Sequence, residues 1–281
     1  MLSIIIVNYK NPPLLRLCLK SLARNLSNTV SYEIIVVDSA STIESRMVVT
    51  DEFTAAFPRI TLVPFSENIG YTRGVNEGIR VAGGEYYLIL NPDIIVLPGS
   101  VEMLLVYAQE HPEAGLIGPQ LLNFDDSIQA SCFRFYTPLT ILYRRIGHLP
   151  LASHVLSPFL MRDVDLRQPT RVDWLMGSAL MTSRSVCEHV GLMDQQFFLY
   201  MSEVDWARRF WDNGYAVLYY PSAQLYHYHK RESKGRFGIF DVLFKRETRW
   251  HIADAIRYFI KHGIRVPHHH RAQPALFGRI S

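Results

Sequence analysis

The first 110 residues alternate between short apolar runs and segments whose apolar residues recur at helical spacing. The runs are rich in Ile, Val and Leu, as in strands buried on both faces, and lie at 4–7, 33–37, 60–64 and 86–90. Helical spacing predicts one helix spanning Leu14 to Leu22 and a second spanning Ser100 to Glu110. This alternation predicts an α/β fold with a mostly parallel central sheet flanked by helices.

The chain is less regular beyond this point. Periodicity weakens between about 120 and 172, where four prolines fall among scattered arginines. A long irregular stretch in a compact domain is usually functional or mobile, so we expect a functional insertion there. A strand-like run follows at 216–221.

Polar side chains stand where three of the predicted strands end. Asn8, Asp38 and Asp93 each follow an apolar run, and Asp93 closes the tripeptide that starts at Asn91. In open α/β sheets, ligands bind beyond the carboxyl ends of the strands. Taken singly, each of these residues is equally a turn former or helix cap. A carboxylate at the end of a buried strand also suits a hard divalent cation whose shell is completed by diphosphate oxygens.

A second group of acids lies at 203 and 205. If a helix begins near Ser202, both Glu203 and Asp205 fall in its first turn, where the helix dipole favours the ionised form. A carboxylate held there can act as a general base. The alternatives are ordinary first-turn acids of an exposed helix, or a division of roles in which one acid pairs with Arg208 or Arg209.

His227 and His229 follow the strand-like run and lie on one face of it if the strand continues. Either histidine can ligate a metal or contact a phosphate, and Lys230 and Arg231 would add positive charge. Two partly buried structural histidines are the alternative.

Composition narrows the class of protein. The chain has 281 residues, of which 48% are hydrophobic, and its many aromatics argue against disorder. The three cysteines are far apart and form no metal-ligand spacing, which suits a reducing cytosol. No basic leader precedes the first strand and no apolar run is long enough to span a bilayer, so we expect a cytoplasmic protein.

The net charge of +3 hides an asymmetry. Residues 1–228 carry 17 Lys and Arg against 22 Asp and Glu, whereas residues 229–281 carry 12 against 4. A basic tail on an acidic body predicts an anionic partner, either a phosphate-bearing ligand or an anionic membrane surface; a solvated helix face is the alternative.

Several ordered motifs resemble the inverting glycosyltransferases of family 2, which have the GT-A (nucleotide-diphospho-sugar transferase) fold, and especially their bacterial rhamnosyltransferase-like branch. The resemblance covers about residues 1–235. The matching segments are IVNY at 6–9, VDSAS at 37–41, ENIGY through GVNEG at 67–78, GEYYLILNPD at 84–93, DWLMGSA at 173–179, GLMD with FF at 191–198, and SEVDWARR at 202–209.

The resemblance implies roles for individual residues. The catalytic acids would be Glu203, in the position of the family's base, and Asp205. Asp93 and His227 would hold Mg²⁺ or Mn²⁺. The residues implied in substrate binding are Asn8, Tyr9, Asp38, Asn68, Gly70, Arg73, Asn76, Asn91, Trp174, Gly177 and Ser178.

Two motifs depart from the family pattern. Ser202 replaces the first acid of its acidic pair and Glu203 the second, so the base reaches one methylene further. Asn91 replaces the first Asp of a strict DxD motif, which leaves fewer charges on the metal.

The resemblance also implies a reaction. A saccharide or lipid-linked saccharide would attack a nucleotide-diphosphate sugar with inversion, during cell-surface polysaccharide synthesis at the cytoplasmic membrane face. The dTDP-rhamnose donor is favoured, with UDP- and GDP-sugars as alternatives. Arg73 is either a donor contact or a surface residue.

Three other classes compete with this interpretation. A sugar nucleotidyltransferase needs a Gly-rich basic loop after the first strand, but residues 8–13 contain no Gly. A non-catalytic relic could retain the acids. Basic and aromatic residues interleave from Tyr226 to Trp250, as in some single-strand binders, yet the acidic body makes nucleic acid a poor partner.

We expect a transferase domain at 1–235, divided into a nucleotide-sugar half at 1–118 and an acceptor and catalytic half at 119–235, and a helical basic extension at 236–281. Apolar residues among the tail's basic residues indicate a peripheral helix on an anionic membrane, or packing on the body. They are Phe237, Phe240, Val242, Leu243, Phe244, Trp250, Ile252, Ile256, Tyr258 and Phe259.

Overall fold

The computed structural model describes residues 1–27, 29–145, 152–228 and 246–264. Predictions for His229, Lys230, Arg231 and the tail's apolar residues 237–244 lie outside these ranges.

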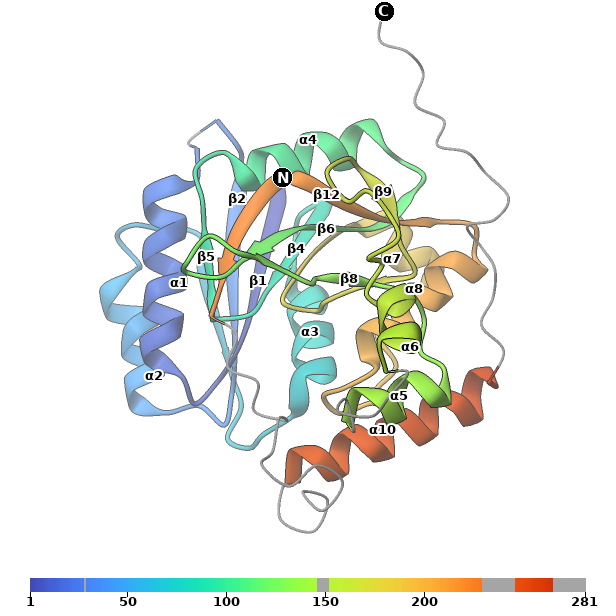
Figure 1. Cartoon of the computed structure of the whole chain (residues 1–281). Coiled ribbons are helices and arrows are strands. Elements are labelled where there is room, and N and C mark those ends of the chain that lie inside the picture. Colours follow the sequence, from blue (N-terminus) through green and yellow to red (C-terminus); the bar gives the residue numbers. More distant parts are fainter. Residues whose placement is uncertain (28, 146–151, 229–245, 265–281) are drawn as a thin grey trace, which may run out of the picture.

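A large mixed sheet forms the centre of the molecule (Figure 1). Its strand order is β3-β2-β1-β4-β11-β6-β12-β5, with β7 beside β6 and β9 beside β12. Strands β1 to β4 are parallel, and β11 runs antiparallel between β4 and β6. The strands are β1 Leu2–Tyr9, β2 Tyr32–Ser39, β3 Ile60–Pro64, β4 Tyr86–Leu90, β5 Ile94–Val96, β6 Ala114–Leu122, β7 Ile128–Gln129, β8 Cys132–Phe133, β9 Thr170–Arg171, β10 Trp174–Leu175, β11 Ala179–Ser183 and β12 Ala216–His227; β8 and β10 pair separately.

Helices cover both faces of this sheet. They are α1 Pro12–Asn25, α2 Ile43–Met47 continuing into the π-helix Val48–Glu52, α3 Gly70–Val81, α4 Ser100–Glu110, α5 Pro138–Arg145, α6 Ala152–Phe159, α7 Arg184–Val190, α8 Ser202–Asp212 and α10 Arg246–His262. Figure 1 shows α1 and α2 on one side of β1 and β2, with α3 on the other. Right-handed crossovers produce this arrangement, because the strand order reverses after β3.

The predicted elements of the first half are confirmed. β1 is buried along all but its last residue, as expected for a strand covered on both faces. Helix α1 begins at Pro12, two residues before the predicted span, because the Asn11 side chain accepts the N–H of Leu14 at 3.3 Å and Pro12 occupies the first turn. The predicted ranges 60–64, 86–90 and 100–110 match β3, β4 and α4.

The segment at 120–172 is more ordered than its weak periodicity indicated. It contains the short strands β7, β8 and β9 and the helices α5 and α6, which pack on each other. Trp174 is buried here against Phe133 and Tyr136, with ring centroids 4.4 and 5.3 Å away. Aromatic packing stabilises a region whose elements are too short to show a clear period.

Helix α10 packs on the body through one face. Trp250 lies 4.7 Å from the ring of Phe198, and Tyr258 is buried. Among the described residues, no helix has the length and hydropathy needed to cross a membrane. Cys18, Cys132 and Cys187 are buried and are not joined by disulfides.

Candidate active site

The end of β4 meets the end of β12 at the carboxyl edge of the sheet. Here Nε2 of His227 lies 3.5 Å from Oδ2 of Asp93 and 3.1 Å from Oγ of Ser178. The Asn91 amide nitrogen lies 3.5 Å from the same serine hydroxyl. The structure therefore brings together four of the predicted site residues, from three separate motifs.

Gln129 fixes the orientation of the His227 ring. Its amide nitrogen donates to the carbonyl of His227 at 2.8 Å and to Oδ1 of Asn123 at 2.6 Å, so its Oε1 must face Nδ1 of His227, 2.9 Å away. Nδ1 of the neutral ring consequently carries the proton, and Nε2 accepts from the Ser178 hydroxyl at 3.1 Å. Sequence analysis missed Gln129, because only the pairing of β7 with β6 brings it beside a residue 98 positions away.

These residues fit a divalent cation. Oδ1 of Asp93 is buried and has no hydrogen-bond partner, and Nε2 of His227 lies 3.5 Å from Oδ2 of the same carboxylate. Within the described ranges, no group of three or more His, Cys, Asp and Glu side chains is placed to hold a metal ion by itself. Mg²⁺ commonly uses one or two protein ligands and takes the rest of its shell from phosphate oxygens and water. Asp93 and His227 would supply such a partial shell.

The ends of β1 and β2 form a neighbouring polar cluster. Asn8 donates to Oδ1 of Asp38 at 2.7 Å, and Ser45 donates to the other oxygen at 2.5 Å. Both Asn8 and Asp38 are completely buried, and Oδ1 of Asn8 has no hydrogen-bond partner. Asn68 joins the cluster by accepting from the Ser39 hydroxyl at 3.2 Å. Asp38 therefore organises this strand edge through two intramolecular hydrogen bonds.

Other residues predicted to bind substrate differ in exposure. Tyr9 is half exposed at the end of β1, and Arg73 is exposed on α3, where its guanidinium lies over the Phe65 ring. Asn76 is buried, and its amide exchanges two hydrogen bonds with the backbone of Met193, at 2.7 and 3.0 Å. Asn76 thus ties α3 to the loop before α8, a structural role that explains its buried position.

The start of α3 connects the two halves of the site. Gly70 has a φ of +77°, and a Cβ there would stand 2.6 Å from the Phe198 carbonyl, so only glycine fits. Its neighbour Tyr71 donates its N–H to the same carbonyl at 3.0 Å and its hydroxyl to the Gly177 carbonyl at 2.6 Å. Gly177 precedes Ser178, which contacts His227, and Phe198 lies five residues before Glu203.

Glu203 stands in the first turn of α8, as predicted. Burial raises the pKa of its carboxyl to about 7; the charge of Asp254 also raises it, whereas backbone and Ser202 hydrogen bonds and the charge of Arg144 lower it. A carboxyl with this pKa is ionised in part at neutral pH, as a general base requires. Met201, just before the helix, has a φ of +63°, so the backbone is strained beside this residue.

Asp205 lies in a different environment. Its carboxylate is buried and accepts from Arg209 at 3.0 Å, Lys261 at 2.7 Å and His262 at 2.7 Å. Although burial opposes ionisation, these partners hold the pKa of Asp205 below its usual range. The geometry favours the division of roles considered above, in which Asp205 pairs with Arg209 and supports the helix that carries Glu203.

Asp254 of α10 is a second residue that sequence analysis missed. Its buried carboxylate accepts the N–H groups of Tyr200 at 3.1 Å and Leu199 at 3.4 Å. These two residues belong to the loop that leads into α8. The C-terminal helix therefore holds the backbone that positions Glu203.

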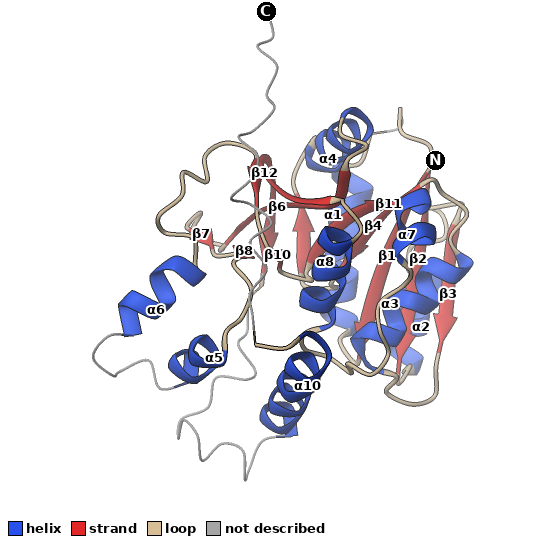
Figure 2. Ribbon diagram, turned by 90° about the vertical axis from the view of Figure 1, so that its right-hand side faces the viewer, coloured by secondary structure: helices blue, strands red, loops and turns tan. Residues whose placement is uncertain are grey.

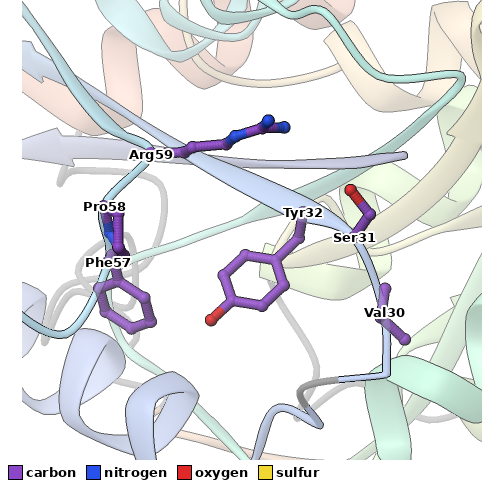
Figure 3. Close-up of a pocket in the computed structure, with 6 residues that line it drawn as sticks. All are labelled: Val30, Ser31, Tyr32, Phe57, Pro58 and Arg59. Carbon is purple, nitrogen blue, oxygen red and sulfur yellow. The ribbon is translucent and has the colours of Figure 1, made fainter.

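Two hollows lie on the surface near the sheet. One of about 240 Å³ lies at the amino ends of β2 and β3, lined by residues 30–32 and 57–59 (Figure 3), and is at the opposite edge from the site. The other, about 160 Å³, adjoins the site, because Asp93 lines it together with apolar side chains of Leu14, Leu17 and Tyr228.

Comparison with known proteins gives a family match and several relatives. The model of the family described as Glycosyl transferase family 2 matches residues 3–205. The N-acetylglucosaminyl-diphospho-decaprenol L-rhamnosyltransferase of Mycobacterium tuberculosis is 30% identical over 84% of this chain and 78% of its own length. The rhamnosyltransferase WbbL of Escherichia coli is 25% identical over 66% of each chain.

Solved structures share the fold. GalNAc-T7 with UDP, GalNAc and Mn²⁺ superposes with a TM-score of 0.66 over 83% of this chain and 44% of that one, at 13% identity. The mannosyltransferase PcManGT of Pyrobaculum calidifontis, in complex with GDP-Man and Mn²⁺, gives 0.58 over 91% and 64%, at 18% identity. This chain thus spans less than two thirds of the length of either structure. Its sheet and flanking helices have the GT-A architecture, and the chain belongs to glycosyltransferase family 2.

Proposed function

We propose that this protein transfers a sugar from a nucleotide-diphosphate sugar to an acceptor hydroxyl with inversion at the anomeric carbon. The proposal rests on one observation: a buried glutamate with a raised pKa is connected to a second cluster that fits a divalent cation. Glu203, with a pKa near 7, is linked through Tyr71 and Gly177 to the Asp93 and His227 cluster, which has an unpartnered carboxylate oxygen. One site suits proton removal and the other suits a diphosphate leaving group.

Each residue would contribute one part of the reaction. Glu203 accepts the proton of the attacking hydroxyl, whose oxygen bonds to the anomeric carbon while the bond from that carbon to the diphosphate breaks. Asp93 and His227 hold Mg²⁺ or Mn²⁺, which when bound supplies positive charge to the departing diphosphate. The polar cluster of Asn8, Asp38 and Asn68 shapes the edge where the nucleotide binds, and Tyr9 and Arg73 offer exposed contacts beside it.

We further propose rhamnose as the sugar and a polyprenyl-diphosphate-linked saccharide as the acceptor. Support comes from the mycobacterial relative, an L-rhamnosyltransferase whose name specifies a diphospho-decaprenol-linked acceptor. The dTDP-sugar is the favoured donor, and UDP- and GDP-sugars are the alternatives to compare with it.

The test incubates the protein with each donor in turn, a polyprenyl-diphosphate saccharide as acceptor, and Mn²⁺. It measures the release of nucleoside diphosphate and the anomeric configuration of the product. We expect Glu203→Gln to lower turnover by about 10²–10⁴-fold with donor affinity retained. Glu188→Gln, at an exposed glutamate of α7, is the matched control and should match the wild type. Normal transfer by folded Glu203→Gln, or product with retained configuration, would refute the proposed mechanism.

A further inference from the structure

Helix α10 leaves an apolar stripe facing solvent. Its inner face is used in packing, with Thr248, Ala255 and Tyr258 buried. On the outer face, Ile256 is 55% exposed and Ile260 is 79% exposed, one helical turn apart, and Ile264 just beyond the helix is 69% exposed. Isoleucines in such a row are costly in water and indicate a contact surface.

Helix α5 adds apolar residues at the same end of the molecule. Leu139 and Leu142 are nearly half exposed and three residues apart, so they share one face. Figures 1 and 2 both show α5 and α10 together at the lower end of the molecule. We define the exposed residues Leu139, Leu142, Ile256, Ile260 and Ile264 as the lower apolar surface.

The exposed charged side chains that the structure describes on α5 and α10 have one sign. Arg144, Arg249 and Arg257 are exposed on the two helices. Asp254 is the acid of α5 and α10 whose side chain the structure describes; it is completely buried and pairs with Arg257 at 2.8 Å. The side chain of Glu247 lies outside those described. Exposed isoleucines and leucines beside arginines, with no exposed acid among these described side chains, match an anionic lipid surface.

We propose that the lower apolar surface docks on a bilayer that contains anionic phospholipid. The arginines lie at headgroup level, and the isoleucines and leucines enter the interface between headgroups and acyl chains. The charges of Arg144 and Asp254 both act on the Glu203 carboxyl, so this docking face adjoins the first turn of α8. A substrate anchored in the bilayer would therefore approach the site from the side of the protein that faces the membrane. The docking does not depend on the proposed reaction.

Vesicle sedimentation of the full chain tests the surface. We expect binding to vesicles of phosphatidylcholine and phosphatidylglycerol, weaker binding to pure phosphatidylcholine, and loss of binding at high salt. The double variant Ile256→Ser, Ile260→Ser should bind at least about fivefold less. Arg249→Gln should reduce the preference for anionic vesicles.

The matched control is Ile43→Ser, Val106→Ser, which removes two exposed apolar residues from α2 and α4 and should bind as the wild type does. Thermal unfolding without vesicles checks that both double variants are folded. Equal vesicle binding by the α10 variant and the wild type would overturn the proposal. So would a wild-type dimer that this variant converts to monomer without a change in vesicle binding, because the surface would then serve self-association.

Discussion

The side-chain oxygen of Gln129 lies 2.9 Å from Nδ1 of His227, on the opposite side of the ring from Asp93. Because the Gln129 amide nitrogen is engaged by the His227 and Asn123 oxygens, the glutamine cannot turn over without losing both hydrogen bonds. This contact selects the tautomer whose Nε2 carries no proton, which is the form that a metal ion would need. Ligating histidines are generally held by such a contact on their other nitrogen.

Replacing Gln129 should therefore weaken metal binding. We expect Gln129→Leu to lower Mn²⁺ affinity about 10–100-fold, measured by electron paramagnetic resonance with a nucleoside diphosphate present. Nitrogen NMR of the His227 ring should show a mixture of tautomers. Gln109→Leu, at an exposed glutamine of α4, is the control. If folded Gln129→Leu bound Mn²⁺ as the wild type does, Gln129 would have no positioning role.

The pKa of Glu203 predicts how turnover varies with pH. Burial raises this pKa to about 7, and a general base acts in its ionised form. Turnover at saturating substrate should thus rise about tenfold per pH unit below 7 and level off above about 8. A profile that is flat from pH 5 to 8 would show that the ionisation of Glu203 does not limit the reaction.

Asp254 provides an independent check on that assignment. Its negative charge contributes to the raised pKa of Glu203, so removing the charge favours ionisation of the glutamate. We expect Asp254→Asn to move the rising limb of the pH profile to lower pH. Asp51→Asn, at an exposed aspartate near α2, should leave the limb in place. A limb that stays at about pH 7 in folded Asp254→Asn would mean that another group titrates there.

Much of the fold could be predicted because its signals are local. The run at 86–90 reads as a strand buried on both faces, and Pro92 just beyond it prevents further pairing. The first turn of α8 was also predictable, since Glu203 and Asp205 precede a helically spaced apolar set. Such features depend on residues close together in the chain.

The rest depends on contacts between distant segments. Asp205 and Glu203 are similar acids two positions apart in the sequence. Contacts with Lys261 and His262 make Asp205 a buried ion-pair partner, whereas burial gives Glu203 a raised pKa. Similarly, nothing local distinguishes Asp254 from an ordinary helix residue, because its hydrogen bonds reach a loop 54 positions away. Register and tertiary packing decide these roles.

Gly70 and Gly99 form a matched pair for testing how α3 meets the loop before Glu203. Both have φ near +75°, but a Cβ at Gly70 would stand 2.6 Å from the Phe198 carbonyl, whereas nothing lies within 4 Å of one at Gly99. Alanine at either position incurs about 1–2 kcal/mol of backbone strain, and Gly70→Ala adds a steric clash of at least about 1 kcal/mol. Urea unfolding should show this difference between the variants, and turnover should fall in Gly70→Ala alone, because displacing Phe198 moves the backbone that leads to Glu203. Equal loss of unfolding free energy in the two variants would mean that the loop before α8 moves away from the added Cβ without an energetic penalty.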